Sequence, residues 1–230
     1  MQIFIVILAV ITGGCSLVGN RSTINNISIP MHITEPEYYE DLSLDDIKKL
    51  NGGTVEIIYL PDINIPKEIK GKFTNGTIKS EEDAIASLAS VRTLMHINEI
   101  SYVCVDIVED EHIKSFYLQQ VYNGVIVLNG TFRVIATYEG EPVAIIGIYI
   151  NGIEIDTTPL VAINDAKKSV ILEKGTKISE TKIAVYKDDD EIVHLCWLFD
   201  IYSREPLKNK TIVVDAYTGK YIIEYPHAIS

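Results

Sequence analysis

The fold is decided by residues 117–130, which read YLQQVYNGVIVLNG. Two apolar runs flank Asn123-Gly124, and Asn-Gly between such runs favours a tight hairpin because both central residues of that turn take positive φ. The stretch therefore predicts two antiparallel strands. Gln119 and Gln120 are neighbours on the first strand, so their side chains point to opposite faces, one toward solvent and the other toward the core.

Around this hairpin the sequence predicts a helix followed by an antiparallel meander. Apolar residues at helical spacing place the helix from Glu81 to about His96, with Ser80 as its N-cap. A shorter helix is expected over 44–50, capped by Ser43. Strands are expected at 54–60, 101–108, 114–122, 125–138 with a break near 129–130, and 142–150.

The same pattern recurs from Thr157 onward. A helix is expected over 165–173, with Asn164 as its N-cap. Strands are expected at 182–187, 191–202, 211–216 and 220–225. The fold class is therefore α+β: two tandem cystatin-like modules, each a helix packed on an antiparallel sheet, over residues 35–151 and 152–230.

The hairpin stretch resembles the core motif of the thermolysin/fungalysin propeptide (FTP) module, which reads roughly Phe-Gln-Gln-x-Tyr-x-Gly-x-Pro-Val-x-Gly. Ile126 departs from that pattern, because proline is common at its position. The motif residues that match are Gln119, Gln120, Tyr122, Gly124 and Gly130.

Residues 213–220, which read VVDAYTGK, resemble the ending of a PepSY module. The matching residues of this ending are Asp215, Thr218 and Gly219, and Leu195-x-Trp197 resembles the central strand of the same module. The two modules occur in this order in the propeptides of thermolysin-like metalloproteases. Neither motif is catalytic, so the resemblance implies a structural role for their residues. It also implies a protein that assists the folding of a metalloprotease or holds it inactive.

The N-terminus has the pattern of a targeting segment. Residues 3–11 are almost entirely apolar, yet the run is shorter than the roughly 20 residues that span a bilayer. Its length is that of a signal-peptide core. The residues Thr12-Gly13-Gly14-Cys15 resemble a bacterial lipobox.

We therefore expect a signal peptide over 1–14, an acylated Cys15, and a polar lipid-linked tether over 15–34. The protein is expected to be extracytoplasmic and anchored to the cell membrane through Cys15. Ordinary secretion is the first alternative, and a buried strand that mimics a signal is the second.

Composition indicates a folded chain that does not bind nucleic acid. The 230 residues are 47% hydrophobic, with a net charge of −12 and no basic cluster to neutralise phosphates. Three cysteines are too few for a disulfide framework. Cys104 and Cys196 lie in apolar strand-like runs, where we expect unpaired buried thiols; a bridge between them is the alternative.

No pattern of catalytic or metal-binding residues stands out. None of the five histidines has the spacing of a helical metal pair. The acidic run Asp188-Asp189-Asp190-Glu191 is expected to be a solvated hairpin tip rather than a calcium site. Trp197 and Tyr122 are expected to be core aromatics. We expect no cofactor, no metal and no enzymatic activity.

The sequence also lacks a His-Glu-x-x-His zinc motif. We therefore expect a non-enzymatic exported protein that binds a partner in trans, as inhibitor or folding chaperone of a secreted thermolysin-like metalloprotease. One alternative is an envelope structural or regulatory module that binds an envelope protein instead. Another is a degenerate prosegment.

Overall fold

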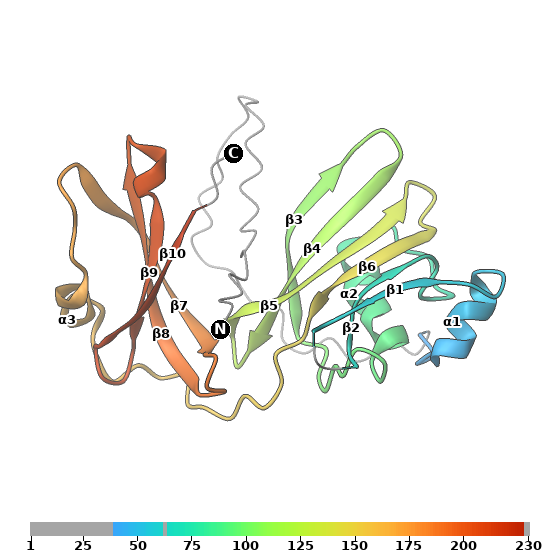
Figure 1. The fold of residues 1–230 in the computed structure, drawn as a ribbon, viewed down its shortest axis with the longest axis horizontal. Coiled ribbons are helices and arrows are strands. Elements are labelled where there is room, and N and C mark those ends of the chain that lie inside the picture. The colour runs from blue at the N-terminus through green and yellow to red at the C-terminus, as the bar shows by residue number, and fades with distance from the viewer. Residues whose placement is uncertain (1–38, 62–63, 228–230) are drawn as a thin grey trace. The chain divides into compact units, whose positions relative to one another are not determined.

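The computed structural model describes residues 39–61 and 64–227. Within these residues the chain forms two compact units, an N-terminal unit that ends at Ile153 and a C-terminal unit that begins at Glu154. Both are drawn in Figure 1. The predicted signal peptide, the lipidation site Cys15 and the whole tether over 15–34 lie outside the described residues, so those predictions stay predictions.

Two short helices of the N-terminal unit begin at the predicted caps. Helix α1 (Leu44–Leu50) starts after Ser43, whose side chain and that of Asp46 form a capping box. Helix α2 (Glu81–Ala86) starts after Ser80 in the same way. Both helix starts are therefore confirmed.

Helix α2 is shorter than predicted, because it tightens into a 3-10 turn, η1 (Ser87–Val91). Two buried serines mark the change. The Ser87 hydroxyl donates to the Ala84 carbonyl at 2.8 Å, and the Ser90 hydroxyl donates to Thr74 Oγ1 at 2.7 Å. Serine hydroxyls that bond to nearby groups compete with regular helical bonding.

The sheet of the N-terminal unit is wholly antiparallel, with strand order β1-β2-β6-β5-β4-β3. The predicted hairpin is confirmed, since Asn123 has φ 46° and Gly124 has φ 82° between β4 and β5. The strands are β1 (Glu56–Tyr59), β2 (Pro66–Lys70), β6 (Pro142–Ile148), β5 (Val125–Thr137), β4 (Ile113–Tyr122) and β3 (Tyr102–Glu109).

Strand β5 passes through the predicted break without ending. Asn129 takes φ 67°, and the register against β4 shifts between Gln119 and Val121. These two features form a local irregularity of the bulge kind, which bends a strand without ending it. The predicted interruption at 129–130 is thus a kink inside one long strand.

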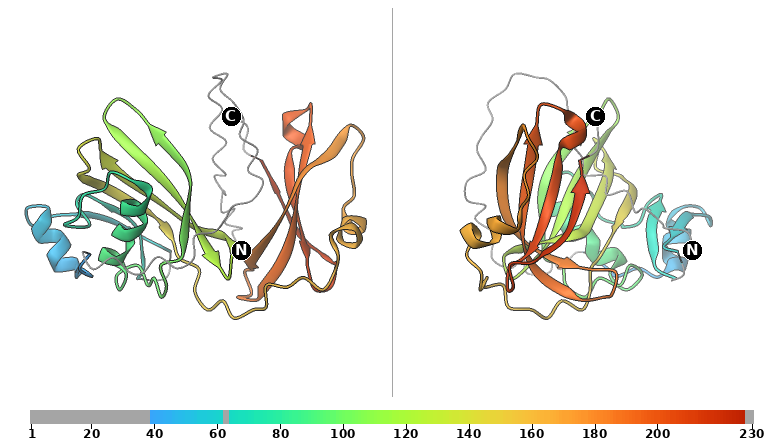
Figure 2. Two further views of the ribbon diagram at one scale, coloured as in Figure 1. Left: turned by 180° about the vertical axis from the view of Figure 1, so that it is seen from behind. Right: turned by 60° about the vertical axis from the view of Figure 1, so that its left-hand side comes forward.

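The core of the N-terminal unit lies between helix α2 and the sheet. Helix α2 packs against β3 and β4, as Figures 1 and 2 allow the reader to follow. Its Ala84 and Ile85 are buried together with Leu88 of the following turn. From the strands, the core includes the fully buried residues Phe116, Leu118, Phe132, Val134 and Ile145.

The C-terminal unit is a four-stranded antiparallel sheet in the order β7-β8-β9-β10. Strand β7 begins six residues before its predicted start at 182. Buried Phe199, Ile201, Ile212 and Val214 form its core with Ala166. The strands are β7 (Thr176–Lys187), β8 (Val193–Ser203), β9 (Lys210–Asp215) and β10 (Tyr221–Pro226).

The helix of this unit differs from its prediction. Helix α3 (Ile163–Ala166) has four residues and passes into a 3-10 turn, η2 (Lys167–Ser169), instead of running to 173. Its N-cap is Ala162, which makes no side-chain cap hydrogen bond. The prediction of Asn164 as the N-cap is therefore wrong: Asn164 lies inside the helix.

Strands dominate the described residues and helices are few, which agrees with the α+β class. Among these residues there is no helix with the length and apolar content needed to cross a bilayer.

Candidate functional site

Gln120 binds one residue of the backbone with both ends of its amide. Its Nε2 donates to the Ile150 carbonyl at 2.8 Å, and its Oε1 accepts from the Ile150 N–H at 2.9 Å. The side chain imitates the double hydrogen bond of two paired strand residues. Because Gln120 is only 3% exposed, both bonds are sheltered from water.

Gln119 points to the other face and fastens the kink of β5. Its Nε2 donates to the carbonyls of Val127 at 2.5 Å and Gly130 at 3.0 Å. Gly130 leaves the room that Gln120 needs, because a Cβ at this position would lie 2.3 Å from Gln120 Oε1. The two glutamines and Gly130 thus form one structural unit, which we call the glutamine clamp.

Two further motif residues of the hairpin lie near the surface. Gly124 sits exposed in the tight turn, at the positive φ that this turn requires. Tyr122 is half-buried and so is not the core aromatic that was expected.

The second motif forms a tight turn around one carboxylate at the end of β9. Asp215 Oδ1 accepts the Tyr217 N–H at 3.0 Å, the Thr218 N–H at 2.7 Å and the Thr218 hydroxyl at 2.9 Å. Gly219 follows at φ 72°. This is the self-capped turn that a short acidic side chain favours.

Trp197 fixes the segment that precedes α3. Its Nε1–H donates to the Val161 carbonyl at 2.9 Å, and its ring packs against the core of the C-terminal unit while remaining half-buried. The ring is therefore at the edge of the core rather than inside it.

The other oxygen of Asp215 belongs to a cluster that sequence reasoning missed. His194 Nδ1 lies 3.1 Å from Asp215 Oδ2, and His194 Nε2 lies 3.0 Å from Asp188 Oδ2. One imidazole therefore connects the turn after β9 with the turn between β7 and β8. We call these three residues the Asp–His–Asp bridge.

The bridge shifts the pKa of each of its members. Burial alone would lower the pKa of His194, but the hydrogen bonds that its ring donates to Asp188 and Asp215 outweigh burial and raise that pKa above its ordinary value. The hydrogen bond from His194 lowers the pKa of Asp188. Burial opposes the same effect at Asp215, yet the bonds from His194 and Thr218 lower its pKa.

The bridge corrects one expectation. Asp188 is not a freely solvated tip residue, although Asp189 and Asp190 beside it are exposed. Long-range pairing brings the members together, because Asp215 pairs with Cys196, two residues beyond His194 on β8. No local spacing in the sequence carries that register.

Both described cysteines are free. Cys196 is buried as expected, whereas Cys104 is only half-buried. Burial raises the pKa of both thiols, which keeps them protonated and poorly nucleophilic.

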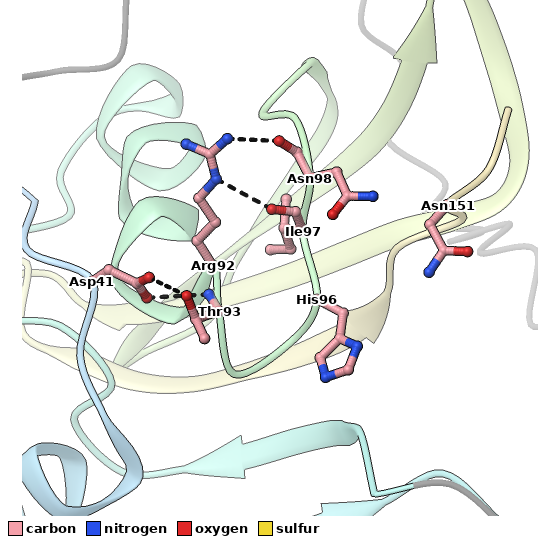
Figure 3. A pocket seen from close by; sticks show the side chains of 7 residues that line it. All are labelled: Asp41, Arg92, Thr93, His96, Ile97, Asn98 and Asn151. Carbon is pink, nitrogen blue, oxygen red and sulfur yellow. Dashed lines mark hydrogen bonds between the residues drawn. The ribbon is translucent and has the colours of Figure 1, made fainter. Parts of the chain in front are cut away.

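An open hollow of about 500 Å³ lies in the N-terminal unit, and Figure 3 shows the residues that line it. Its polar groups are largely bound to the chain itself. The Asp41 carboxylate accepts from the Thr93 N–H at 3.2 Å and from its hydroxyl at 2.5 Å. Arg92 donates to the carbonyls of Ile97 at 3.2 Å and Asn98 at 2.6 Å. These bonds close the end of the turn that follows α2.

His96, at the rim of this hollow, takes φ 56°, a backbone conformation that costs a non-glycine residue about 1 kcal/mol or more. We expect His96→Gly to raise the free energy of unfolding by about 0.5 to 1 kcal/mol, because glycine relieves this strain but loses more chain entropy. Thermal unfolding measures the change. His96→Ala is the matched control, since it keeps the Cβ; a melting temperature for His96→Gly at or below that of His96→Ala would contradict the expectation.

Strand β3 is an outer strand of its sheet and exposes apolar side chains. It pairs with β4 alone. Beyond Cys104 the register shifts and Val105 bulges out. Val105 is 56% exposed, Ile107 43% and Val108 42%. Because Ile107 and Val108 are consecutive residues of the strand, their side chains lie on opposite faces of the sheet, so this outer strand exposes apolar side chains on both faces.

The backbone of this edge is partly protected. Asp106 Oδ1 accepts the Ile107 N–H at 2.9 Å, and the bulge interrupts the flat edge. Bulges and charged side chains are the devices that prevent indiscriminate strand addition. Contacts at this end of the β3–β4 hairpin therefore depend on side chains more than on open backbone groups.

No protein-family model matches the chain. No curated protein matches it either. Among solved structures it is similar to one described as the Bacillus megaterium YpeB C-terminal domain, with 14% sequence identity and a TM-score of 0.44. The similarity covers 82% of this chain and 99% of that one, and it is distant.

Proposed function

We propose that the chain is a non-enzymatic exported binding protein that holds a partner polypeptide against the β3–β4 hairpin. The partner is a secreted thermolysin-like metalloprotease, which the chain inhibits or helps to fold. The observation that carries the proposal is the exposed apolar end of β3, formed by Val105, Ile107 and Val108.

The polar motif residues are already engaged in hydrogen bonds within their own units. The amides of Gln119 and Gln120 and the carboxylate of Asp215 are bound to the backbone of their own unit. Side chains that bond to their own backbone in this way stabilise the fold and are not available to a partner. A binding surface is therefore better sought among exposed side chains than among the motif residues.

The exposed side chains of β3 can supply a useful binding energy. Burying one valine or isoleucine side chain is worth roughly 1.5 to 3 kcal/mol. Asp106 and Glu111 flank the surface, whereas Glu109 is paired with Lys114 at 2.9 Å; the acidic pair favours a partner with a basic surface and faster association at low salt.

The choice of a metalloprotease rests on the resemblance of the two motifs to the FTP and PepSY modules. In this proposal the two units are tandem cystatin-like modules. Helix α2 in the first core and Ala166 of α3 in the second support that view. Export and an acylated Cys15 would bring the protein to the place where such a protease acts.

The test is a titration of residues 16–230 into a secreted thermolysin-like protease from the same source. We expect loss of protease activity, or a higher yield of refolded protease, at micromolar protein or below. Neither effect at micromolar protein would overturn the proposal. Recovery of envelope proteins and no protease from membranes would favour the envelope module instead.

A substitution on β3 tests where the partner binds. We expect Val105→Lys to weaken binding about tenfold or more, since it removes roughly 1.5 kcal/mol of apolar burial. Isothermal titration measures the dissociation constant. The matched control is Ile171→Lys, at a position 84% exposed in the other unit, which should leave binding unchanged. Equal affinities for the two variants would exclude β3 as the site.

A further inference from the structure

We propose that the Asp–His–Asp bridge is a pH-operated latch. In acid it fastens the turn between β7 and β8 (residues 188–192) to the turn after β9 (residues 215–219). As the pH rises through neutrality, it releases the first of these turns. The inference goes beyond the proposed function and does not depend on any partner.

The geometry demands a charged imidazole for both contacts to be favourable. His194 presents one ring nitrogen to each carboxylate, at 3.0 Å and 3.1 Å. The imidazolium carries a proton on both nitrogens, whereas neutral imidazole carries one. In the neutral form one carboxylate therefore faces a nitrogen lone pair, and that contact turns from attractive to repulsive.

The Asp188 contact is the one that breaks. Asp215 holds three further hydrogen bonds and its side chain is 12% exposed, which fixes it in place. Asp188 accepts only two further hydrogen bonds, from the N–H groups of Asp190 and Ile192, and its side chain is 22% exposed. The remaining proton of His194 therefore stays on Nδ1, toward Asp215. Water can replace the lost bond of Asp188.

The other groups around His194 do not supply a second titration near neutrality. Tyr186 stacks on the imidazole with ring centroids 6.3 Å apart, and Tyr225 meets Tyr186 edge-on. Burial raises the pKa of Tyr225 and of nearby Cys196, so both stay neutral.

Four more charged residues lie on this turn or directly before it. They are Lys187, which pairs with Glu191, Asp189, whose charge acts on Tyr225, and the exposed Asp190. Of all these residue types, histidine alone ordinarily changes charge between pH 5 and 8.

The sign of the effect follows from the pKa shifts. The raised pKa of His194 means that its contribution to stability is complete below its ordinary value of 6.5 and is lost as the pH rises through the folded-state value. The lowered pKa of Asp188 and Asp215 means that their contribution is present above 3.8 and is lost as the pH falls through the folded-state values. The latch is therefore closed between these two limits.

Amide hydrogen exchange on the isolated protein tests the latch. The readouts are the N–H groups of Asp190 and Ile192, whose acceptor is Asp188 Oδ1. After correction for the intrinsic effect of pH, we expect their protection to fall roughly tenfold or more between pH 5 and pH 8.5, the loss that breaking one charge-assisted hydrogen bond gives. Protection that stays constant across this range would overturn the proposal.

The matched variant is Asp188→Asn. An asparagine can accept from the backbone with its oxygen and donate to neutral His194 with its amide. We expect its protection not to fall between pH 5 and pH 8.5, because the amide donates to the neutral imidazole that forms as the pH rises. His227→Gln is the control, because His227 is a second histidine near a carboxylate, with Nε2 3.9 Å from Asp200 Oδ1. This variant should show the same loss of amide protection with rising pH as the wild type. A full pH dependence in Asp188→Asn, or its loss in His227→Gln, would contradict the latch.

Discussion

Asp215→Ala is expected to destabilise the C-terminal unit by about 3 to 5 kcal/mol, the largest effect of any single substitution that we propose. The change removes the acceptor of three hydrogen bonds in the turn and leaves His194 with one carboxylate instead of two. For a unit of this size the loss corresponds to a fall of roughly 12 to 40 °C in melting temperature. Thermal and urea unfolding measure it.

Two controls separate the roles of the Asp215 carboxylate. Asp215→Asn keeps an oxygen for the turn but loses the charge that faces His194, so we expect about half of the loss. Asp189→Ala removes the same charge from an exposed position beside the bridge and should change stability by about 0.5 kcal/mol at most. If Asp215→Ala costs no more than Asp189→Ala, the second motif does not hold the turn.

Gln120→Leu is expected to destabilise the N-terminal unit by about 2 to 4 kcal/mol. Leucine fills a similar space but cannot bond to Ile150, so a backbone donor and a backbone acceptor both lose their partner. Urea unfolding, followed by a signal from this unit, measures the change. A cost below about 0.5 kcal/mol would contradict the clamp.

The variant Gln120→Glu is expected to lose stability by an amount that depends on pH. The glutamate can accept from the Ile150 N–H, but its second oxygen faces the Ile150 carbonyl, which is 2.8 Å from the present Nε2. Protonation restores a donor at this place, so the folded state raises the pKa of the new carboxyl. We therefore expect the deficit relative to wild type to shrink as the pH falls toward about 4 and to be complete at neutral pH. A deficit that is independent of pH would show that the Ile150 carbonyl does not need a donor.

The features that the sequence predicted well are set by neighbouring residues. Asn123-Gly124 defines its hairpin within two positions, and Ser43 and Ser80 cap helices through a partner three residues on. Such signals require no knowledge of the rest of the fold. The predicted strands lie close to the observed ones except for β7, which begins six residues earlier, and β2, which was not predicted.

The features that were missed depend on contacts between distant segments. The turn after α2 is shaped by the bond from Ser90 to Thr74, sixteen residues away. Gly147 is required because a Cβ there would lie 2.2 Å from the Thr131 carbonyl of the neighbouring strand. His194 meets its two carboxylates only after β7, β8 and β9 have paired.

The candidate site shows the same division. The motif residues lie in strands and turns, yet their bonding partners were not predictable from the sequence. The amide of Gln120 reaches Ile150, thirty residues further on. The exposed end of β3 could not be recognised either, since its alternating apolar residues are equally typical of a half-buried strand.

The most direct test compares a clamp variant with a surface variant in one measurement: the concentration of protein that halves the activity of the thermolysin-like protease. It is made at a temperature and pH at which unfolding curves show that wild type, Gln120→Glu and Val105→Lys are all folded. We expect Gln120→Glu to match wild type and Val105→Lys to require about ten times more protein. If Gln120→Glu is the weakened variant and Val105→Lys matches wild type, then the motif itself touches the partner and β3 is not the binding surface.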